Sequence, residues 1–222
     1  MVAFVLLGAG KGMEERARND AATTASAWLG VRAVAADFAW IGVQAAWEQQ
    51  DSVATTAAIR RTVTWDPNCS LFWINGARMI AYDFAAWRIA EAGGPGIVPG
   101  LLEQRWRNEQ ALQALAHLDA ALTAHPDEVN FLIEQGNIEL WARGNLAGAA
   151  AAFGQAANMA GAPDYALRLE VGLLRRLGRS PEALRRLETY RSKFDANSSN
   201  SPLGRWIDDM LVLLRWELEM IN

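Results

Sequence analysis

Apolar side chains recur every three or four positions along most of this chain, which is the period of an α-helix. No run of alternating apolar and polar residues is long enough to predict a β-strand. A helix-start signal at Asp51-Ser52 and breaks at 66–68 and 93–96 divide the periodic stretches. The first half of the chain therefore predicts one long or one broken helix over 13–27 and 29–48, then helices over 52–65, 70–92 and 101–124.

The second half predicts shorter helices joined by tight turns. Cap signals and the apolar period place these helices at 128–142, 146–159, 165–177, 182–194 and 202–221. The turn glycines Gly144 and Gly178 are 34 residues apart, which indicates a repeating unit. The last helix has one apolar face, and we expect it to cover the open end of the array, as terminal repeats do.

A small–large–small spacing repeats along the chain with nearly the same period. The pattern A-x3-L-x2-A begins at Ala114, and its positions recur from Ala149 and Ala183, 35 and then 34 residues later. Thr55 begins a degenerate upstream copy. A single helix pair cannot bury its outer face, so neighbouring pairs stack. The expected fold class is all-α, an α-α superhelix of antiparallel helix pairs with a C-terminal capping helix.

Over roughly 36–194 these motifs resemble the tetratricopeptide repeat (TPR) family. The matching segments are T-x3-I-x2-T-x4-P from Thr55, A-x3-L-x2-A-x4-P from Ala114, G-N-x3-A-x3-F-x2-A from Gly144 and G-R-x3-A-x3-L-x2-Y from Gly178. Trp73 takes the family's tryptophan place, whereas the usual Leu-Gly pair is missing there. The resemblance implies a TPR-like solenoid that binds other proteins, and it implies no catalytic activity.

The repeat spacing also predicts how the chain is divided. Thr55 and Ala114 are 59 residues apart, 25 more than one repeat, which predicts a 25-residue insertion within about 85–110. We expect one TPR-like helical domain over 13–222, preceded by an apolar segment at 1–12. That segment is far shorter than a membrane span. It is either the stub of a membrane anchor or a short plug that packs on the protein.

In a stack of this kind the first helix of each pair lines the concave face. The helical register predicts that partner-binding side chains on this face are Asn75, Arg78, Tyr82, Glu134, Ile138, Trp141, Tyr165, Arg168 and Arg175. Trp and Arg are the residues that most often anchor protein interfaces. The ten tryptophans of the chain are explained either by core packing or by an aromatic binding face.

Composition and motifs limit the kinds of ligand and reaction that this chain is expected to support. The hydrophobic fraction is 51% and the net charge is −4, which argues against disorder and gives little support to nucleic-acid binding. The glycine-rich segment 8–12 lacks the first glycine and the hydroxyl of a phosphate loop. Neither His117 nor His125 has a partner at metal-ligand spacing. We therefore expect no catalytic residues, no metal and no cofactor.

The sequence thus predicts a non-enzymatic scaffold that binds a protein or peptide on the concave face of a TPR-like solenoid. The alternative is a structural subunit of a membrane-associated bacterial assembly, in which the N-terminus, the insertion and the end helix make the contacts. An enzyme with an unrecognised site is a third hypothesis. Only two of the 21 basic residues are lysines, which suggests a GC-rich bacterial genome. The location stays open between the cytoplasm and a membrane-associated or periplasmic site.

Overall fold

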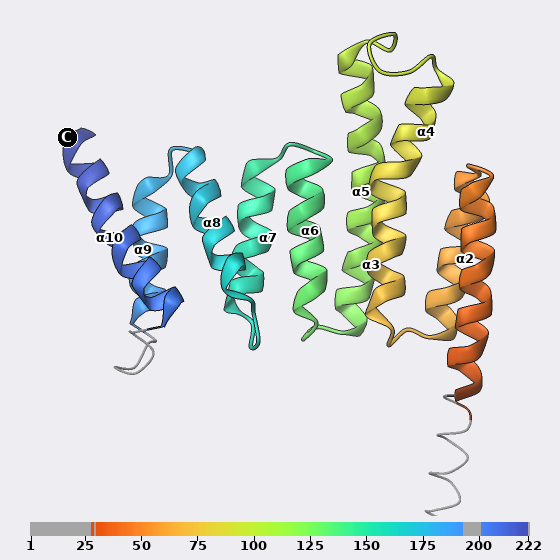
Figure 1. Ribbon diagram of the computed structural model, residues 1–222, viewed down its shortest axis with the longest axis horizontal. Helices are drawn as coiled ribbons and strands as arrows, with labels where there is room; N and C mark the ends of the chain where they lie inside the picture. Colours follow the sequence, from red (N-terminus) through yellow and green to blue (C-terminus); the bar gives the residue numbers. More distant parts are fainter. Residues whose placement is uncertain (1–27, 29, 193–200, 222) are drawn as a thin grey trace, which may run out of the picture. The chain divides into compact units, whose positions relative to one another are not determined.

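The computed structural model describes residue 28 and residues 30–192 and 201–221 (Figure 1). The apolar segment 1–12, with its membrane-anchor hypothesis, and the helix expected at 13–27 lie outside these residues. Regular structure in the described ranges is helical, apart from one isolated bridge between Pro95 and Val98. The chain forms two compact units that meet in sequence between Phe72 and Trp73. A single domain over 13–222 stays a prediction.

Unit 1 contains an antiparallel helical hairpin. A helix over 30–48 is followed by α2 (Ser52–Trp65), as the sequence predicts. Asp51 caps α2, because its carboxylate accepts bonds from the backbone N–H groups of Val53 and Ala54 at 3.0 and 2.8 Å. At the other end of α2, Arg32 donates to two of the last carbonyls, the Nε atom to Trp65 at 3.0 Å and the Nη2 atom to Thr64 at 3.1 Å.

Unit 2 is an array in which each helix packs against the next one along the chain. Its elements are α3 (Ser70–Arg78), which begins in unit 1, the π-helical segment η1 (Met79–Asp83), α4 (Phe84–Glu91), α5 (Gly100–Ala124), α6 (Val129–Trp141), α7 (Leu146–Asn158), α8 (Asp164–Arg176), α9 (Ser180–Arg191) and α10 (Pro202–Ile221). Successive helices from α5 to α10 alternate in direction (Figure 1). The fold is all-α, a superhelix of antiparallel pairs closed by α10, which confirms the expected class.

The observed helices differ from the expected ones in several details. The helix over 70–91 contains η1, because the backbone between Arg78 and Phe84 widens into a π-helical turn. Glu128, expected as the first helical residue, is instead the cap of α6, because its carboxylate accepts the backbone N–H of Asn130 at 3.2 Å. Helix α9 ends at Arg191, three residues before the expected end. The long helices 70–91 and α5 flank the glycine loop where the insertion is expected.

Small residues let the helices of unit 2 approach closely. A Cβ atom placed on Gly136 of α6 would lie 2.8 Å from the ring of Phe153 on α7, so the ring rests directly on the α6 backbone. Ala149 and Ala156 on α7 have no exposed surface. The core continues through Leu167 of α8 and on to α9 and α10. The small–large–small spacing is therefore the packing pattern between successive helices.

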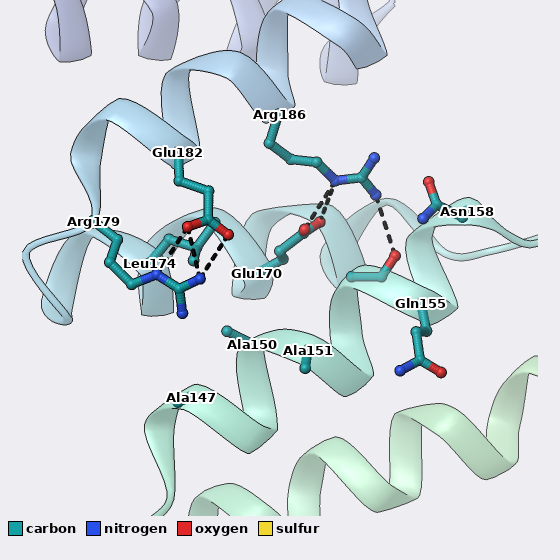
Figure 2. Close-up of a pocket in the computed structure, with 11 residues that line it drawn as sticks. Ala147, Ala150, Ala151, Gln155, Asn158, Glu170, Leu174, Arg179, Glu182 and Arg186 are labelled. Atoms are coloured by element: carbon teal, nitrogen blue, oxygen red, sulfur yellow. Dashed lines mark hydrogen bonds and ion pairs between the residues drawn. The ribbon is translucent and has the colours of Figure 1, made fainter.

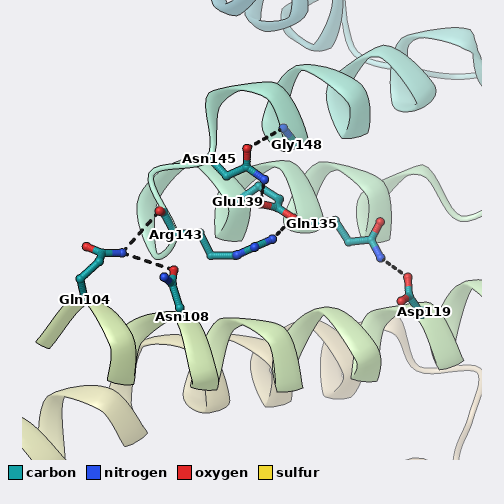
Figure 3. A network of polar contacts seen from close by, with 8 residues as sticks. All are labelled: Gln104, Asn108, Asp119, Gln135, Glu139, Arg143, Asn145 and Gly148. Atoms are coloured by element: carbon teal, nitrogen blue, oxygen red, sulfur yellow. Dashed lines mark hydrogen bonds and ion pairs between the residues drawn. The ribbon is translucent and has the colours of Figure 1, made fainter. Parts of the chain in front are cut away.

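A polar network fixes the turn between α6 and α7 (Figure 3). Gly144 has a φ of +65°, which glycine adopts without strain. Asn145 caps α7 by accepting the Gly148 N–H at 3.1 Å, and its amide donates to Glu139 at 2.8 Å. Gln104 of α5 donates to the carbonyl of Arg143 at 3.4 Å. The turn is thereby tied to both helices beside it.

Two alanine substitutions test this account of close packing. Gly136→Ala should lower the free energy of unfolding by about 1–2 kcal/mol, because overpacking against Phe153 outweighs the gain in helix propensity. Gly172→Ala on α8 should instead raise it by up to about 1 kcal/mol, since a Cβ atom there meets nothing within 4 Å. Urea denaturation followed by circular dichroism measures both values. Equal effects of the two substitutions would contradict the packing described.

Candidate partner-binding surface

The face of unit 2 that carries the predicted binding residues is called the inner surface below. It is formed by α3 with η1, by α6 and by α8, the first helices of successive pairs. The predicted residues are distributed over these elements as Asn75 and Arg78 on α3, Tyr82 on η1, Glu134, Ile138 and Trp141 on α6, and Tyr165, Arg168 and Arg175 on α8. The structure shows which of these side chains are still accessible.

Arg78 and Glu134 form a two-pronged ion pair that joins α3 to α6. The Nε and Nη2 atoms of Arg78 donate to the two carboxylate oxygens of Glu134 at 3.0 and 2.7 Å. The Glu134 side chain is only 4% exposed, whereas that of Arg78 is 53% exposed. The amide of Asn137 adds a longer bond of 3.5 Å to the same carboxylate. Glu134 is therefore occupied within the protein, and only the outer part of Arg78 faces solvent.

The pKa values of Arg78 and Tyr82 reflect this ion pair. The hydrogen bond from Arg78 to Glu134 raises the pKa of the guanidinium above its ordinary value. Burial, followed by the nearby Glu134 charge, raises the pKa of the half-buried Tyr82 to about 12. Tyr82 therefore keeps its proton at neutral pH and can act as a hydrogen-bond donor. Asn75 is also half-buried.

The structure corrects the sequence-based prediction for Ile138. This side chain has no exposed surface, so a partner cannot contact it. The physical reason is that α6 packs against α5 on one side and α7 on the other, which leaves little of its circumference free. Trp141, one turn further along the same face, is 73% exposed. It is the accessible residue among the three predicted on α6.

On α8 the predicted residues are accessible, but two of them also contact the last helix. Tyr165 and Arg168 are exposed, and Arg175 is half-buried. The guanidinium of Arg168 lies 5.1 Å from the ring centre of Trp206 on α10. Arg175 forms an ion pair with Glu217, also on α10. Helix α10 therefore extends the inner surface beyond α8.

Sequence reasoning missed three residues of this surface. Trp206 and Glu217 were treated as parts of a covering helix only, although α10 follows α9 as α8 follows α7. Gly172 lies four residues after Arg168 and three before Arg175, on the same face of α8. A Cβ atom at Gly172 would meet nothing within 4 Å, so the surface is open there. The helical period could have indicated Gly172, whereas Trp206 and Glu217 required knowing that α10 continues the array.

A separate groove is lined by residues of α7, α8 and α9 (Figure 2). Its volume is about 360 Å³, and alanines of α7 line one wall. Arg186 of α9 donates through Nε to both oxygens of Glu170 at 2.8 Å and through Nη2 to the Gly154 carbonyl at 3.2 Å. A Cβ atom at Gly154 would lie 2.6 Å from the Glu170 carboxylate, so this glycine admits the buried pair.

Two structural features are absent from the described residues. No three His, Cys, Asp or Glu side chains among them lie close enough together to hold a metal ion. Within the same ranges, no helix combines the length and the apolar character that crossing a membrane requires. The inner surface presents exposed aromatic rings and guanidinium groups, which suit non-covalent recognition.

Glu170 generates a pH prediction. Burial, only partly offset by Arg186, raises the pKa of its carboxyl above the ordinary value, so folding favours the protonated form. This contribution to stability is present below the pKa of the unfolded chain and is lost as the pH rises through the raised native pKa. The free energy of unfolding of the native chain, relative to Glu170→Gln, should therefore rise as the pH falls from 7 to about 4.5. Urea denaturation measures the free energy of unfolding of both proteins across this pH range. A difference between them that does not change with pH would contradict the prediction.

Comparisons with known proteins find a distant similarity. No family model and no curated protein matches the chain. Among solved structures, the crystal structure of PilW, a widely conserved type IV pilus biogenesis factor, is similar to this chain. The two are 14% identical, the match covers 76% of this chain and 80% of that one, and the TM-score is 0.31. The all-α architecture therefore rests on the helix pairs described above.

Proposed function

We propose that this chain is a non-enzymatic scaffold whose inner surface binds a protein or peptide partner. The observation that carries the proposal is Trp141, a tryptophan 73% exposed on a first helix of the array. Exposed single hydrophobic residues are common, but Trp, Tyr and Arg are the usual anchors of a protein interface. The neighbouring first helix α8 carries an exposed aromatic, Tyr165, and an exposed cation, Arg168, nearer its other end.

The internal ion pairs reduce the number of charged side chains that a partner could bind at the proposed site. Glu134 is committed to Arg78, and Arg175 is committed to Glu217, so neither is a free charge for a partner. The side chains left for recognition on α6 and α8 are Trp141, Tyr165 and Arg168. Gly172 leaves open surface between Arg168 and Arg175 into which a partner side chain could enter. The proposed site therefore lies over α6 and α8.

The same proposal includes membership of the TPR family. It is supported by the repeated turn at Gly144 and Gly178, both with positive φ, and by the stacking of short antiparallel pairs from α6 to α9. Phe153 and Leu187 occupy matching positions of successive second helices and have no exposed surface. A helical repeat of this kind presents a continuous surface for another chain and needs no reactive group to act.

A blocking substitution tests the site without removing any native contact. Gly172→Gln fills the open surface of α8, and helix propensity predicts that it does not destabilise the fold. Gly100→Gln, at the start of α5, is the matched control because a Cβ atom there also meets open space. Affinity capture from host extracts with the native chain identifies the partner. Titration by calorimetry then measures how each variant binds it.

The expected result is that Gly172→Gln and Trp141→Ala each weaken binding at least about tenfold, while Gly100→Gln binds normally. Thermal unfolding should show all three variants folded. A partner that binds Gly172→Gln and Trp141→Ala as tightly as the native chain would exclude the inner surface. Failure to capture any partner from soluble and membrane fractions would contradict the scaffold function itself.

A further inference from the structure

The outer side of the first hairpin carries a row of uncovered apolar residues. Trp28, Val31, Val34, Phe38 and Ile41, called the apolar stripe below, are each between 54% and 69% exposed. Their spacing of three or four residues places them on one face of the helix. Isolated exposed hydrophobic residues need no explanation, but a continuous row of five does.

The opposite face of the same helix is also apolar. Ala36 and Val43 have no exposed surface, and the Trp40 ring lies 5.2 Å from that of Phe72. A helix that is apolar on both faces is usually buried on both faces. Of the two charged residues within the span of the stripe, Arg32 is turned aside, because its guanidinium bonds to the last carbonyls of α2, and the exposed Asp37 lies at the edge of the stripe. The helix therefore has the character of an interior element with one side uncovered.

The size of the stripe fits an interface between two proteins. From their exposed fractions, its five side chains present roughly 600 Å² per chain, about the largest apolar patch found on monomers. Burial of two such stripes against each other would remove roughly 1,200 Å², the lower limit of a specific interface. One further copy of this chain is therefore sufficient to cover the stripe.

We propose that the apolar stripe is the interface of a homodimer in which two copies of this helix pack antiparallel about a two-fold axis near Val34. The order of side chains supports this register. With the axis at that point, Val31 of one copy faces Phe38 of the other, and Trp28 faces Ile41. Along the interface, a smaller side chain therefore packs against a larger one. A two-fold interface requires such self-complementarity.

Other occupants fit less well. An amphipathic helix that binds lipid headgroups carries Lys and Arg beside its apolar face, whereas the described residues 30–48 of this helix contain one arginine, already bonded to α2. The apolar residues 2–7 would form only about 9 Å of helix, against about 20 Å between the ends of the stripe. Neither occupant would cover the row from Trp28 to Ile41.

Sedimentation equilibrium of the full chain tests the proposal. The native chain should be a dimer at micromolar concentration, and Phe38→Glu should weaken the dimer at least about tenfold by placing a charge in the interface. Val53→Glu, at a position 79% exposed on α2 and outside the stripe, is the matched control and should leave the dimer intact. Circular dichroism checks that both variants are folded.

A crosslink keeps the test valid if Phe38→Glu fails to fold. In a Cys69→Ser background, Val34→Cys should form a disulfide between copies on mild oxidation, while Val53→Cys should not. A monomeric native chain, a Phe38→Glu variant that still dimerises, or equal crosslinking at both positions would overturn the proposal. A monomer that floats with phosphatidylcholine vesicles unless Phe38 is Glu would assign the stripe to lipid instead and would equally overturn it.

Discussion

The close approach of successive helices in unit 2 is the constraint on which the rest of the structure depends. The Phe153 ring can rest on α6 only because position 136 is glycine, and Ala149 and Ala156 keep α7 near its neighbours. Once α7 is placed in this way, α8 packs against it in turn. The short distance between helices therefore determines where the first helices, and the side chains on them, face solvent.

The ion pairs of buried carboxylates determine how neighbouring helices are arranged more than they stabilise the fold. Glu134 on α6 is held by Arg78 of α3, and Glu170 on α8 is held by Arg186 of α9. Removing two charges from water costs about as much free energy as their attraction returns, so such pairs chiefly disfavour other arrangements. Because Glu134 and Glu170 are paired within the array, the accessible side chains on α6 and α8 include Trp141, Tyr165 and Arg168, the residues of the proposed site.

Local features of the fold could be predicted from the sequence, whereas contacts between distant residues could not. Caps and turn residues such as Asp51 and Gly144 act on their immediate neighbours, so most helix boundaries were predicted to within one or two residues. The π-helical segment η1 has no comparable local signal. Ile138 was misplaced because its burial depends on two flanking helices, and Arg78 finds Glu134 across 56 residues. The pairing of α8 with α10 required knowing that the last helix continues the array.

Hydrogen–deuterium exchange of the full chain, with and without its captured partner, tests the central claim most directly. The account predicts that the partner slows exchange in segments from the end of α6 and from α8, the elements that carry Trp141 and Arg168. Exchange in α7 and α9, which together with α8 line the separate groove beside Glu170, should change little. Protection confined to α7 and α9, or to the first hairpin, would show that the partner binds elsewhere and would contradict a binding site on the inner surface.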